Sequence, residues 1–571
     1  MYEEARAKNC YTFSMISDLL KGMIEKALAA RALSLQDIHL EHPSGTLHGD
    51  YASNVALVLA KERGENPREL AENFVRYIVQ NLPEKVEKVE VAEPGFINFY
   101  LSRKFFADTL RDILAEGEDW GSNKELSGKK IMVEYTDPNP FKEFHIGHLM
   151  PNVIGESISR LIAFSGAEVK RANYQGDVGL HVAKAVWGMQ RMGDVSASAE
   201  MGKAYALGSK AYEERAESKQ EMDALNKKIY ARSDAGVTAL YDYGRKLSLE
   251  HFETLYKRLG TRFDFYFFES ETGPIGAKLV RERIGSVFEK SDGAVVFHGE
   301  KEGLHTRVFF NSEGLPTYEA KELGLAFLKE ERFPTNFSIS VTGNEITEYF
   351  KVVRAALRAI APNLAEKLVH IPHGMLRVPS GKMSSRTGDV IAAERLIEEV
   401  SKKVREKMSE RTVKDKETTV ETIAIGAIKY SILKQAIGGD IVFDFEKSVS
   451  FEGDSGPYLQ YAATRAASVL EKAKTNNQSP AATHPTKDIQ SIERLLYRFP
   501  EVVLRAAREY APQYVATYLV ELAAAFNHWY AEEKIIDETP ESPYKLALTS
   551  AFHLTMVNGL ALLGIKTPEQ M

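Results

Sequence analysis

Two short segments of the 571-residue chain gather side chains that suit phosphate chemistry. In the first, His145 and His148 flank Ile146 and Gly147. Two imidazoles at this spacing can both donate hydrogen bonds to phosphoryl oxygens, and a glycine lets a flat base approach the backbone. A pair of capping histidines or half of a metal site gives the same pattern. The tetrapeptide alone leaves these roles open, although no cysteine or acidic cluster accompanies it to complete a metal site.

The second segment, residues 381–388, reads GKMSSRTG. Two glycines flank two cations and three hydroxyl groups, a composition that suits a loop closing over phosphates. The side chains of interest are Lys382, Ser384, Ser385 and Arg386. A solvated basic turn has the same composition, and the segment by itself favours that interpretation. The sequence has no GxxxxGK[ST] pattern, which argues against a P-loop ATPase.

A strand, a loop and a helix must position the two histidines. Residues 131–135 (IMVEY) are short, apolar and partly β-branched, as expected of a strand, and the two prolines in 136–144 forbid a helix there. A helix is expected from 145 to about 166, followed by a second strand at 168–174. This order predicts a βαβ unit in a parallel sheet. His145 would then open a helix, where free N–H groups and the helix dipole favour phosphate.

The remaining pattern predicts three domains. Residues 1–118 read as a small α+β domain, residues 125–410 as a parallel α/β domain, and residues 411–571 as a helical bundle. The α/β domain is interrupted at about 190–260 by a charged helical stretch with few aliphatic residues, which we expect to be a solvated arm. Further strands are expected at 263–269, 294–298, 306–311 and 337–342.

Composition narrows the class of protein. Hydrophobic residues make up 44% and charged residues 27%, an ordinary globular mix. The single cysteine, Cys10, excludes a disulfide framework and a cysteine-based zinc site, and fits a cytoplasmic location. We expect neither a signal peptide nor a membrane span, and no membrane partner. The net charge of −7 excludes a strongly basic DNA packager, so no DNA partner is expected, while a local basic face can still bind RNA.

The two phosphate motifs, taken together, resemble those of class I aminoacyl-tRNA synthetases. Longer segments resemble arginyl-tRNA synthetase more closely, and they are collinear over nearly the whole chain apart from 190–260. They are GDYASNVALVLAKERGENPRELA (49–71), VEYTDPNPFKEFHIGHL (133–149), YQGDVG (174–179), LPTYEAKELGL (315–325), GAIKYSIL (426–433), SFEGDSGPYLQYAATRAASVL (450–470) and ALLGIKTPEQM (561–571). The resemblance implies a Rossmann-like parallel-sheet catalytic domain, a small α+β N-terminal domain and an all-α C-terminal anticodon-binding bundle.

The resemblance also implies the chemistry. Such an enzyme ligates L-arginine to tRNA(Arg) through an arginyl-adenylate, using ATP with Mg²⁺. The catalytic residues implied are His145, His148, Lys142, Lys382 and Arg386, and the ATP-binding residues are Gly147, Met375, Ser384 and Ser385. In the general class I pattern a second lysine stands where this chain has Ser385, so we interpret Arg386 as the surviving second charge.

The resemblance places the arginine substrate among five residues. Glu134 and Asn139 match positions that hold its amino and carboxylate end, and Tyr318 matches a pocket tyrosine. Glu322 stands where the family usually has aspartate, and Glu348 aligns with a family glutamine. Carboxylates suit a five-donor guanidinium. Without the resemblance, we would expect Glu134 to be an exposed strand residue and Tyr318 to be a core aromatic residue.

For tRNA, the resemblance implies base and backbone contacts from the C-terminal bundle. The candidates are Tyr458, Tyr461, Arg465, Trp529 and Met571, with Tyr530 as a further aromatic and Asn54 in the N-terminal domain. For any single aromatic here, core packing remains the alternative. The resemblance implies a monomer. Competing hypotheses are another class I synthetase, a synthetase-like scaffold that binds tRNA without catalysis, and an adenylyltransferase.

Overall fold

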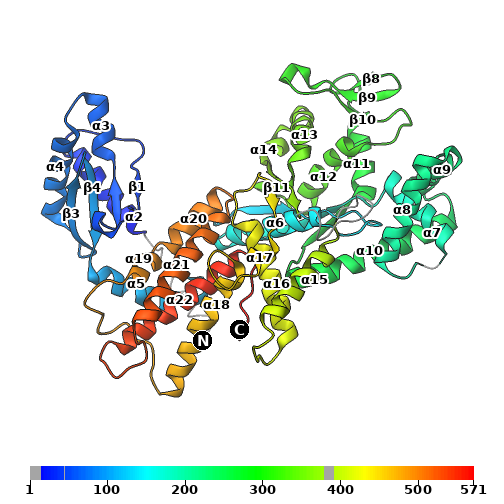
Figure 1. Cartoon of the computed structure of the whole chain (residues 1–571). Helices are drawn as coiled ribbons and strands as arrows, with labels where there is room; N and C mark the ends of the chain where they lie inside the picture. The colour runs from blue at the N-terminus through cyan, green and yellow to red at the C-terminus, as the bar shows by residue number, and fades with distance from the viewer. Residues whose placement is uncertain (1–14, 44, 194, 379–390) are drawn as a thin grey trace, which may run out of the picture. The chain divides into compact units, whose positions relative to one another are not determined.

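The computed structural model describes residues 15–43, 45–193, 195–378 and 391–571 (Figure 1). The chain divides into two compact units. Unit 1 comprises Met1–Lys124, Leu459–Arg505 and Thr517–Leu560, and unit 2 comprises Glu125–Tyr458, Ala506–Ala516 and Ala561–Met571. Among the described residues, no helix combines the length and the apolar character that crossing a membrane requires.

The N-terminal part of unit 1 is a four-stranded antiparallel sheet in the order β1-β2-β4-β3, packed against helices. Local sequence explains where the helices begin: Pro67 opens α4, and the Asn66 side chain accepts a hydrogen bond from the Arg68 N–H at 2.9 Å. The elements are α2 (Ile16–Ala29), β1 (Leu40–Glu41), β2 (Tyr51–Ser53), α3 (Val55–Arg63), α4 (Pro67–Ile78), β3 (Val86–Ala92), β4 (Phe96–Leu101) and α5 (Arg103–Glu116). This confirms the small α+β domain.

The C-terminal helices α18 (Gly456–Thr475), α19 (Ser491–Leu496), α20 (Phe499–Arg508), α21 (Gln513–Glu532) and α22 (Ser542–Leu562) supply most of the rest of unit 1. Tyr497 is buried in the same hydrophobic cluster as Phe74 and Phe99 of the N-terminal part. Asp50, buried at the end of a loop, accepts a hydrogen bond from the Leu101 N–H at 2.8 Å and pairs with Arg494. The all-helical C-terminus is confirmed.

Unit 2 is built on a five-stranded parallel sheet in the order β12-β11-β5-β6-β7. The strands are β5 (Lys130–Glu134), β6 (Glu168–Gln175), β7 (Phe265–Phe268), β11 (Phe337–Gly343) and β12 (Leu368–His373). Of these five strands, β5 comes first along the chain, yet it lies in the middle of the sheet. The chain adds β6 and β7 on one side and returns for β11 and β12 on the other, so the strand order reverses between β5 and β11. Ligands of open parallel sheets bind beyond the carboxyl ends of the strands at such a point.

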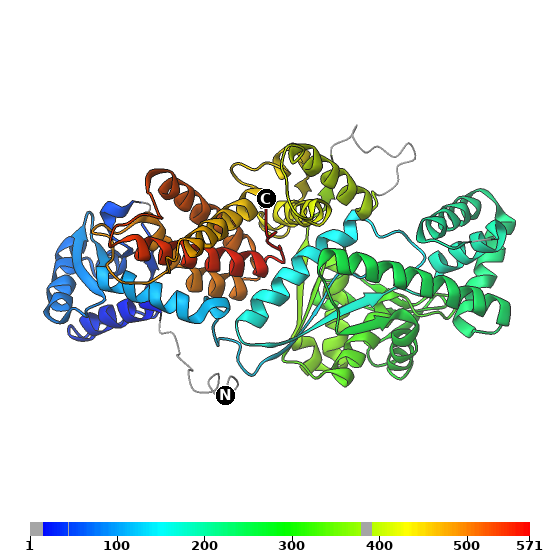
Figure 2. The same cartoon turned by 90° about the horizontal axis from the view of Figure 1, so that it is seen from below.

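Helices cover both faces of this sheet. α6 (Ile146–Phe164) and α10 (Ala235–Leu259) lie on one face, as the cyan and green helices of Figure 2 show. The connections that return across the sheet run on the opposite side (Figure 1), as right-handed crossovers require. They contain α11 (Glu269–Arg281), α12 (Tyr318–Arg332), α13 (Thr347–Ile360) and α14 (Pro362–Lys367). The sheet confirms the predicted parallel α/β domain.

The stretch predicted as a solvated arm has a core of its own, so that prediction was wrong. α7 (Leu180–Met192), α8 (Ser198–Glu214), α9 (Ala216–Ala231) and α10 pack together around buried side chains. Trp187, Met189, Met222 and Tyr241 are among these buried residues. Valines and alanines complete this core beside the aromatic rings and methionines, and the charged residues between them made the stretch look solvated. We call α7–α10 the helical insertion.

Smaller elements complete unit 2. A three-stranded antiparallel sheet is formed by β8 (Glu289–Ser291), β9 (Ala294–Phe297) and β10 (Arg307–Phe310). β13 (Leu376–Arg377) pairs with β14 (Ile441–Val442), and α15 (Ala393–Lys407), α16 (Lys416–Leu433) and α17 (Phe445–Ser448) follow along the chain. The strands predicted at 263–269, 294–298, 306–311 and 337–342 are all present within a few residues.

Candidate active site

The two histidines lie beyond the carboxyl end of β5, at the point where the strand order reverses. The connecting loop contains three non-glycine residues with positive φ: Thr136 at 85°, Asp137 at 47° and Phe141 at 69°. Such values are uncommon for side chains with a Cβ, above all for a β-branched threonine. Backbone strain of this kind is concentrated at ligand sites, where the surrounding structure holds it in place.

The geometry of α6 fixes which nitrogen of each imidazole can donate. His145 is the N-cap residue, and its Nδ1 accepts a hydrogen bond from the Gly147 N–H at 3.1 Å. The His145 N–H donates to Nδ1 of His148 at 3.3 Å, and the two rings stack with centroids 3.7 Å apart. Because each Nδ1 accepts, the proton of each neutral ring is on Nε2. Both rings therefore present an Nε2–H donor. The capping role and the donor role coexist.

The environment keeps both imidazoles neutral. Burial, with a smaller contribution from the nearby Lys142 ammonium, lowers the pKa of His145 to about 4. Burial also lowers the pKa of His148 well below its usual value, helped by His145 and Lys142. Positive charge at this end of the site therefore comes from Lys142 and from the helix N-terminus rather than from imidazolium groups.

The chain that follows the second motif lies beside the first motif. Lys382, Ser384, Ser385 and Arg386 lie outside the described residues. The described part of the chain resumes at Ile391, whose carbonyl accepts a hydrogen bond from the Ile146 N–H at 3.0 Å. Two residues later, the Ala393 N–H donates a hydrogen bond to the Phe144 carbonyl at 2.9 Å. The chain directly after the second motif is thus hydrogen-bonded to the first turn of α6.

In the sequence before the second motif, β12 ends and is followed by β13, which pairs with β14. Met375, predicted to contact ATP, has a 48% exposed side chain, and its N–H donates to Asp440 Oδ1 at 2.9 Å. Gly374 is required here, because a Cβ on it would lie 2.2 Å from the Gly439 carbonyl oxygen. Met375 follows β12 by two residues and therefore lies beyond the carboxyl end of that strand.

Four carboxylates gather with two lysines on the same side of the sheet. We call Glu134, Asp137, Glu269 and Glu322 the acidic cluster. Lys321 Nζ donates to Glu269 Oε2 at 2.6 Å, and both side chains are buried. Lys329 Nζ lies 2.8 Å from Glu134 Oε2 as an ion pair whose angles are poor for a hydrogen bond, so this buried oxygen keeps capacity to accept one.

Crowding raises the pKa of carboxyls in the acidic cluster. Burial, and then the Glu134 charge, raises the pKa of Glu322 to about 8, against the opposing influence of Lys329. Burial and Glu134 likewise raise the pKa of Asp137 well above its usual range, although its side chain accepts a hydrogen bond from the Tyr174 N–H at 2.8 Å. The protein's own lysines do not supply enough positive charge for these carboxyls, as expected of a site for a cationic ligand.

Tyrosines border the acidic cluster. Tyr318, at the start of α12, is 60% exposed, and its ring centroid lies 5.2 Å from Lys321 Nζ. The Glu269 charge helps raise the pKa of Tyr318, after burial, and the Glu322 charge does the same for Tyr174 and Tyr349. Tyr318 and Glu322 are four residues apart on α12, a spacing that puts two side chains on neighbouring positions of one helix face.

Asn139 and Glu348 are placed differently from each other. Asn139 belongs with the acidic cluster: a Cβ on Gly176 would lie 2.3 Å from Asn139 Oδ1 and 3.4 Å from the Glu269 carboxyl carbon. The structure does not bring Glu348 to this group. Its side chain is exposed and pairs with Lys351 at 2.7 Å, whereas its neighbour Tyr349 faces the acidic cluster.

Sequence reasoning missed Asp137, Glu269, Lys321 and Lys329. Glu269 directly follows β7, so a carboxylate at the end of a predicted parallel strand was an available signal. Lys321 lies three residues after Tyr318, close to its helix face. Nothing local identifies Lys329, because its partner Glu134 comes from a distant strand.

The residues predicted to contact tRNA fall into two groups. Arg465 donates to Asn527 Oδ1 at 2.7 Å and to the Tyr461 hydroxyl at 3.1 Å, and its guanidinium lies 5.3 Å from the ring centroid of the exposed Tyr530. Trp529 is only 4% exposed and packs against Phe526, so its indole serves the core.

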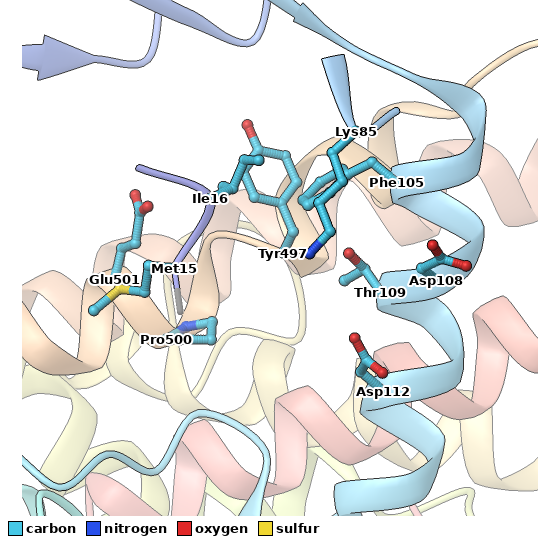
Figure 3. A pocket seen from close by; sticks show the side chains of 10 residues that line it. All are labelled: Met15, Ile16, Lys85, Phe105, Asp108, Thr109, Asp112, Tyr497, Pro500 and Glu501. Atoms are coloured by element: carbon cyan, nitrogen blue, oxygen red, sulfur yellow. The ribbon is translucent and has the colours of Figure 1, made fainter. Parts of the chain in front are cut away.

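The other predicted tRNA contacts are partly buried. Tyr458 lies in the first turn of α18, Met571 ends the chain, and Asn54 precedes α3 as its N-cap residue. A separate pocket in unit 1 contains none of the predicted site residues; Met15, Ile16, Lys85, Phe105, Asp108, Thr109, Asp112, Tyr497, Pro500 and Glu501 line it (Figure 3). Within the described parts of the chain, no group of three or more His, Cys, Asp or Glu side chains is arranged to hold a metal ion.

Family models match three successive regions of the chain. The catalytic domain of class I tRNA synthetases of the arginine type matches residues 109–445. The N-terminal domain of arginyl-tRNA synthetase matches residues 15–101, and the DALR anticodon-binding domain matches residues 459–571.

Individual relatives span the same length. An arginine–tRNA ligase of Treponema denticola is 30% identical over 586 residues, which cover 98% of this chain and 98% of the relative. One of Streptococcus thermophilus is 31% identical over 547 residues, covering 93% of this chain and 95% of the relative. The solved structure of Thermus thermophilus arginyl-tRNA synthetase matches with a TM-score of 0.76 at 25% identity, covering 98% of this chain and 100% of that one.

Proposed function

The chain belongs to the arginyl-tRNA synthetase family, and from this premise we propose how its site ligates L-arginine to tRNA(Arg). Arginine reacts with ATP to give arginyl-adenylate and pyrophosphate, and the arginyl group then passes to the terminal adenosine of the tRNA with release of AMP. The domains proposed for these tasks are residues 125–410 for catalysis, 411–571 for the anticodon and 1–118 for the tRNA body.

The acidic cluster carries the assignment of the amino-acid substrate. Its four carboxylates face two buried lysines, which leaves two negative charges when all are ionised. Arginine brings two cations, a guanidinium and an α-ammonium. The raised pKa values of Glu322 and Asp137 show that their ionised forms need added positive charge, so a ligand that brings two cations is favoured over a neutral amino acid.

Individual roles follow from placement. Glu134, with an oxygen that can still accept a hydrogen bond, receives the α-ammonium, and Asn139 contacts the same end of the substrate. Glu322 and Glu269 receive the guanidinium, and the half-exposed Tyr318 borders it. The planar fork of the guanidinium suits two carboxylates at once, which a lysine ammonium would not.

The histidine end serves the nucleotide. The Nε2–H groups of His145 and His148 donate to phosphate oxygens as charge develops on them during in-line attack by the arginine carboxylate, and Lys142 adds a positive charge. Gly147 gives adenine access to the backbone, with Met375 at the same side of the sheet. Lys382, Ser384, Ser385 and Arg386 keep the roles that the resemblance implies.

Magnesium enters with ATP in this proposal. The side chains assigned to the nucleotide are two neutral imidazoles and an ammonium, which contact phosphate oxygens rather than a hard cation. Phosphate oxygens and water are the ligands that Mg²⁺ prefers. This ion would neutralise phosphate charge that the protein leaves uncovered.

For tRNA, we assign Tyr461 and Arg465 to the anticodon region together with the exposed Tyr530. Unpaired bases stack on aromatic and guanidinium surfaces, and both are offered here. Tyr458, Met571 and Asn54 remain further candidates, whereas Trp529 is left to the core. We infer a monomer that works in the cytoplasm, which mass measurement in solution and cell fractionation would check.

The decisive experiment is amino-acid-dependent ATP–pyrophosphate exchange with each of the twenty amino acids, in the presence and absence of tRNA(Arg). We expect exchange with arginine alone and only when tRNA is present. Exchange with another amino acid would favour a different class I synthetase. No exchange, together with retained tRNA binding, would favour the non-catalytic scaffold.

A further inference from the structure

The first two helices of the helical insertion are packed closely against each other. A Cβ on Gly188 of α7 would lie 2.0 Å from the Ala204 carbonyl oxygen of α8, and one on Gly208 would lie 2.0 Å from the Lys184 carbonyl oxygen. Only glycine allows two helix backbones to approach this closely. α8 is therefore held in a fixed position along α7.

The same helix also lies against the loop that precedes the histidines. A Cβ on Gly202 would lie 2.8 Å from Cγ of Glu143. Tyr205 follows Gly202 by three residues, on a neighbouring position of the same helix face. Its ring centroid lies 5.1 Å from Nζ of Lys142, within the range of a cation–π interaction.

Lys142 is central to the site. Its charge contributes to lowering the pKa of His145, His148 and His181, and it also acts on Glu269 of the acidic cluster. The ammonium thus lies between the nucleotide end and the amino-acid end. A lysine side chain has four rotatable bonds, so something must select the conformation that points it there.

We propose that Tyr205 is a positioning residue that holds Lys142 in place for the reacting phosphate, so that the helical insertion forms part of the active site. This inference rests on the proposed function, because it takes the phosphate role of Lys142 from it. The aromatic ring supplies the restraint through its face, and the hydroxyl is not required.

The test is arginine- and tRNA-dependent pyrophosphate exchange by the full chain with Tyr205→Leu and Tyr205→Phe. We expect Leu to lower kcat about tenfold, in line with the strength of a partly buried cation–π contact, with a smaller change in the KM for ATP and none in the KM for arginine. Phe keeps the ring and should retain at least about half of the wild-type kcat. Equal losses in the two variants would overturn the proposal.

Tyr212→Leu is the matched control. Tyr212 lies two turns further along α8, its ring faces Lys184 Nζ at 4.5 Å, and its hydroxyl donates to Asp223 Oδ1 at 3.1 Å. The substitution therefore removes the same kind of contact, and one hydrogen bond besides, from the same helix. We expect an unchanged kcat. If Tyr212→Leu lowers kcat as much as Tyr205→Leu does, the effect comes from loosening of the insertion, and the proposal fails.

A double-mutant cycle separates positioning from general damage. In a Lys142→Met background, Tyr205→Leu should cause no further loss of kcat, because the residue that it positions is gone. Additive losses would reject the inference. The two proposals fail differently: a wild-type chain that does not exchange with arginine refutes the proposed function, whereas an active chain with additive losses refutes only the role of Tyr205.

Discussion

The two ends of the site use charge in opposite ways. At the amino-acid end, the acidic cluster is crowded with buried carboxyls, and two lysines of the protein already neutralise part of it. At the nucleotide end, both imidazoles are neutral, and the donors are fixed by hydrogen bonds within the first turn of α6. In the function proposed above, the first end would select its ligand by charge, and the second would stabilise a reacting group through oriented dipoles.

This difference follows from what each ligand brings. Arginine is cationic and must be distinguished from other amino acids, which buried carboxyls that need a cation in order to ionise would do well. ATP is already anionic, so the protein needs donors aimed at charge that develops only in the transition state. Each prediction below perturbs one end and requires the other to stay unchanged.

The largest effect is expected at the nucleotide end. His145→Ala removes an Nε2–H donor, and we expect kcat for pyrophosphate exchange to fall by about two to three orders of magnitude with little change in the KM for arginine. Because His145 is also the N-cap residue, part of the loss would reflect the helix. His145→Gln, which can present an amide N–H near the same position, should recover some activity. A shift in the KM for arginine instead would erase the distinction between the two ends.

At the amino-acid end, Glu322→Gln keeps the shape and removes the charge. We expect the KM for arginine to rise about a hundredfold, or about 2.7 kcal/mol, with a smaller change in kcat. Glu348→Gln is the matched comparison, because its carboxylate is exposed and paired with Lys351. For Glu348→Gln we expect a KM for arginine within about twofold of the wild-type value. A large effect of Glu348→Gln would restore the alignment-based prediction.

Glu348 shows where sequence reasoning reaches its limit. The strands, the parallel sheet and the histidines at a helix N-terminus could all be predicted, because each depends on local pattern. Two neighbouring residues at the start of α13 could face the acidic cluster, and a shift of one residue along the helix decides which of them does so. Each residue turns a helix by about 100°, so Tyr349 faces the acidic cluster while Glu348 faces solvent.

Long-range pairs were out of reach for a different reason. Lys329 and Glu134 are far apart in the sequence, and their ion pair exists only because α12 packs near the end of β5. A lysine in a charged stretch such as KEER reads as solvated, yet Lys329 is buried. The core of the helical insertion was hidden similarly, because its buried valines, alanines and methionines are interspersed with charged residues along each helix. Tertiary packing decides burial in both cases.

The pH dependence should differ between the ends. Burial and the Glu134 charge raise the pKa of Glu322 to about 8, so below pH 8 the carboxyl is mostly protonated and cannot form an ion pair with a guanidinium. The KM for arginine should therefore fall as pH rises, about fivefold between pH 7 and pH 8. The pKa of His145 is about 4, so titration of this group produces no inflection in the pH profile of kcat over the same range. A KM independent of pH in wild type, matching that of Glu322→Gln, would contradict the assignment.

The smallest effect concerns salt, and it separates buried from exposed electrostatics. Both partners of the ion pairs Lys321–Glu269 and Lys329–Glu134 are about 95% buried, so mobile ions screen them weakly. We expect the KM for arginine to change by less than about twofold between about 50 and 200 mM salt. The affinity for tRNA should fall by at least about tenfold over the same interval, because phosphate contacts release counterions. Titrations of both ligands in one buffer series would check this, and equal salt dependence would mean that the acidic cluster is open to solvent.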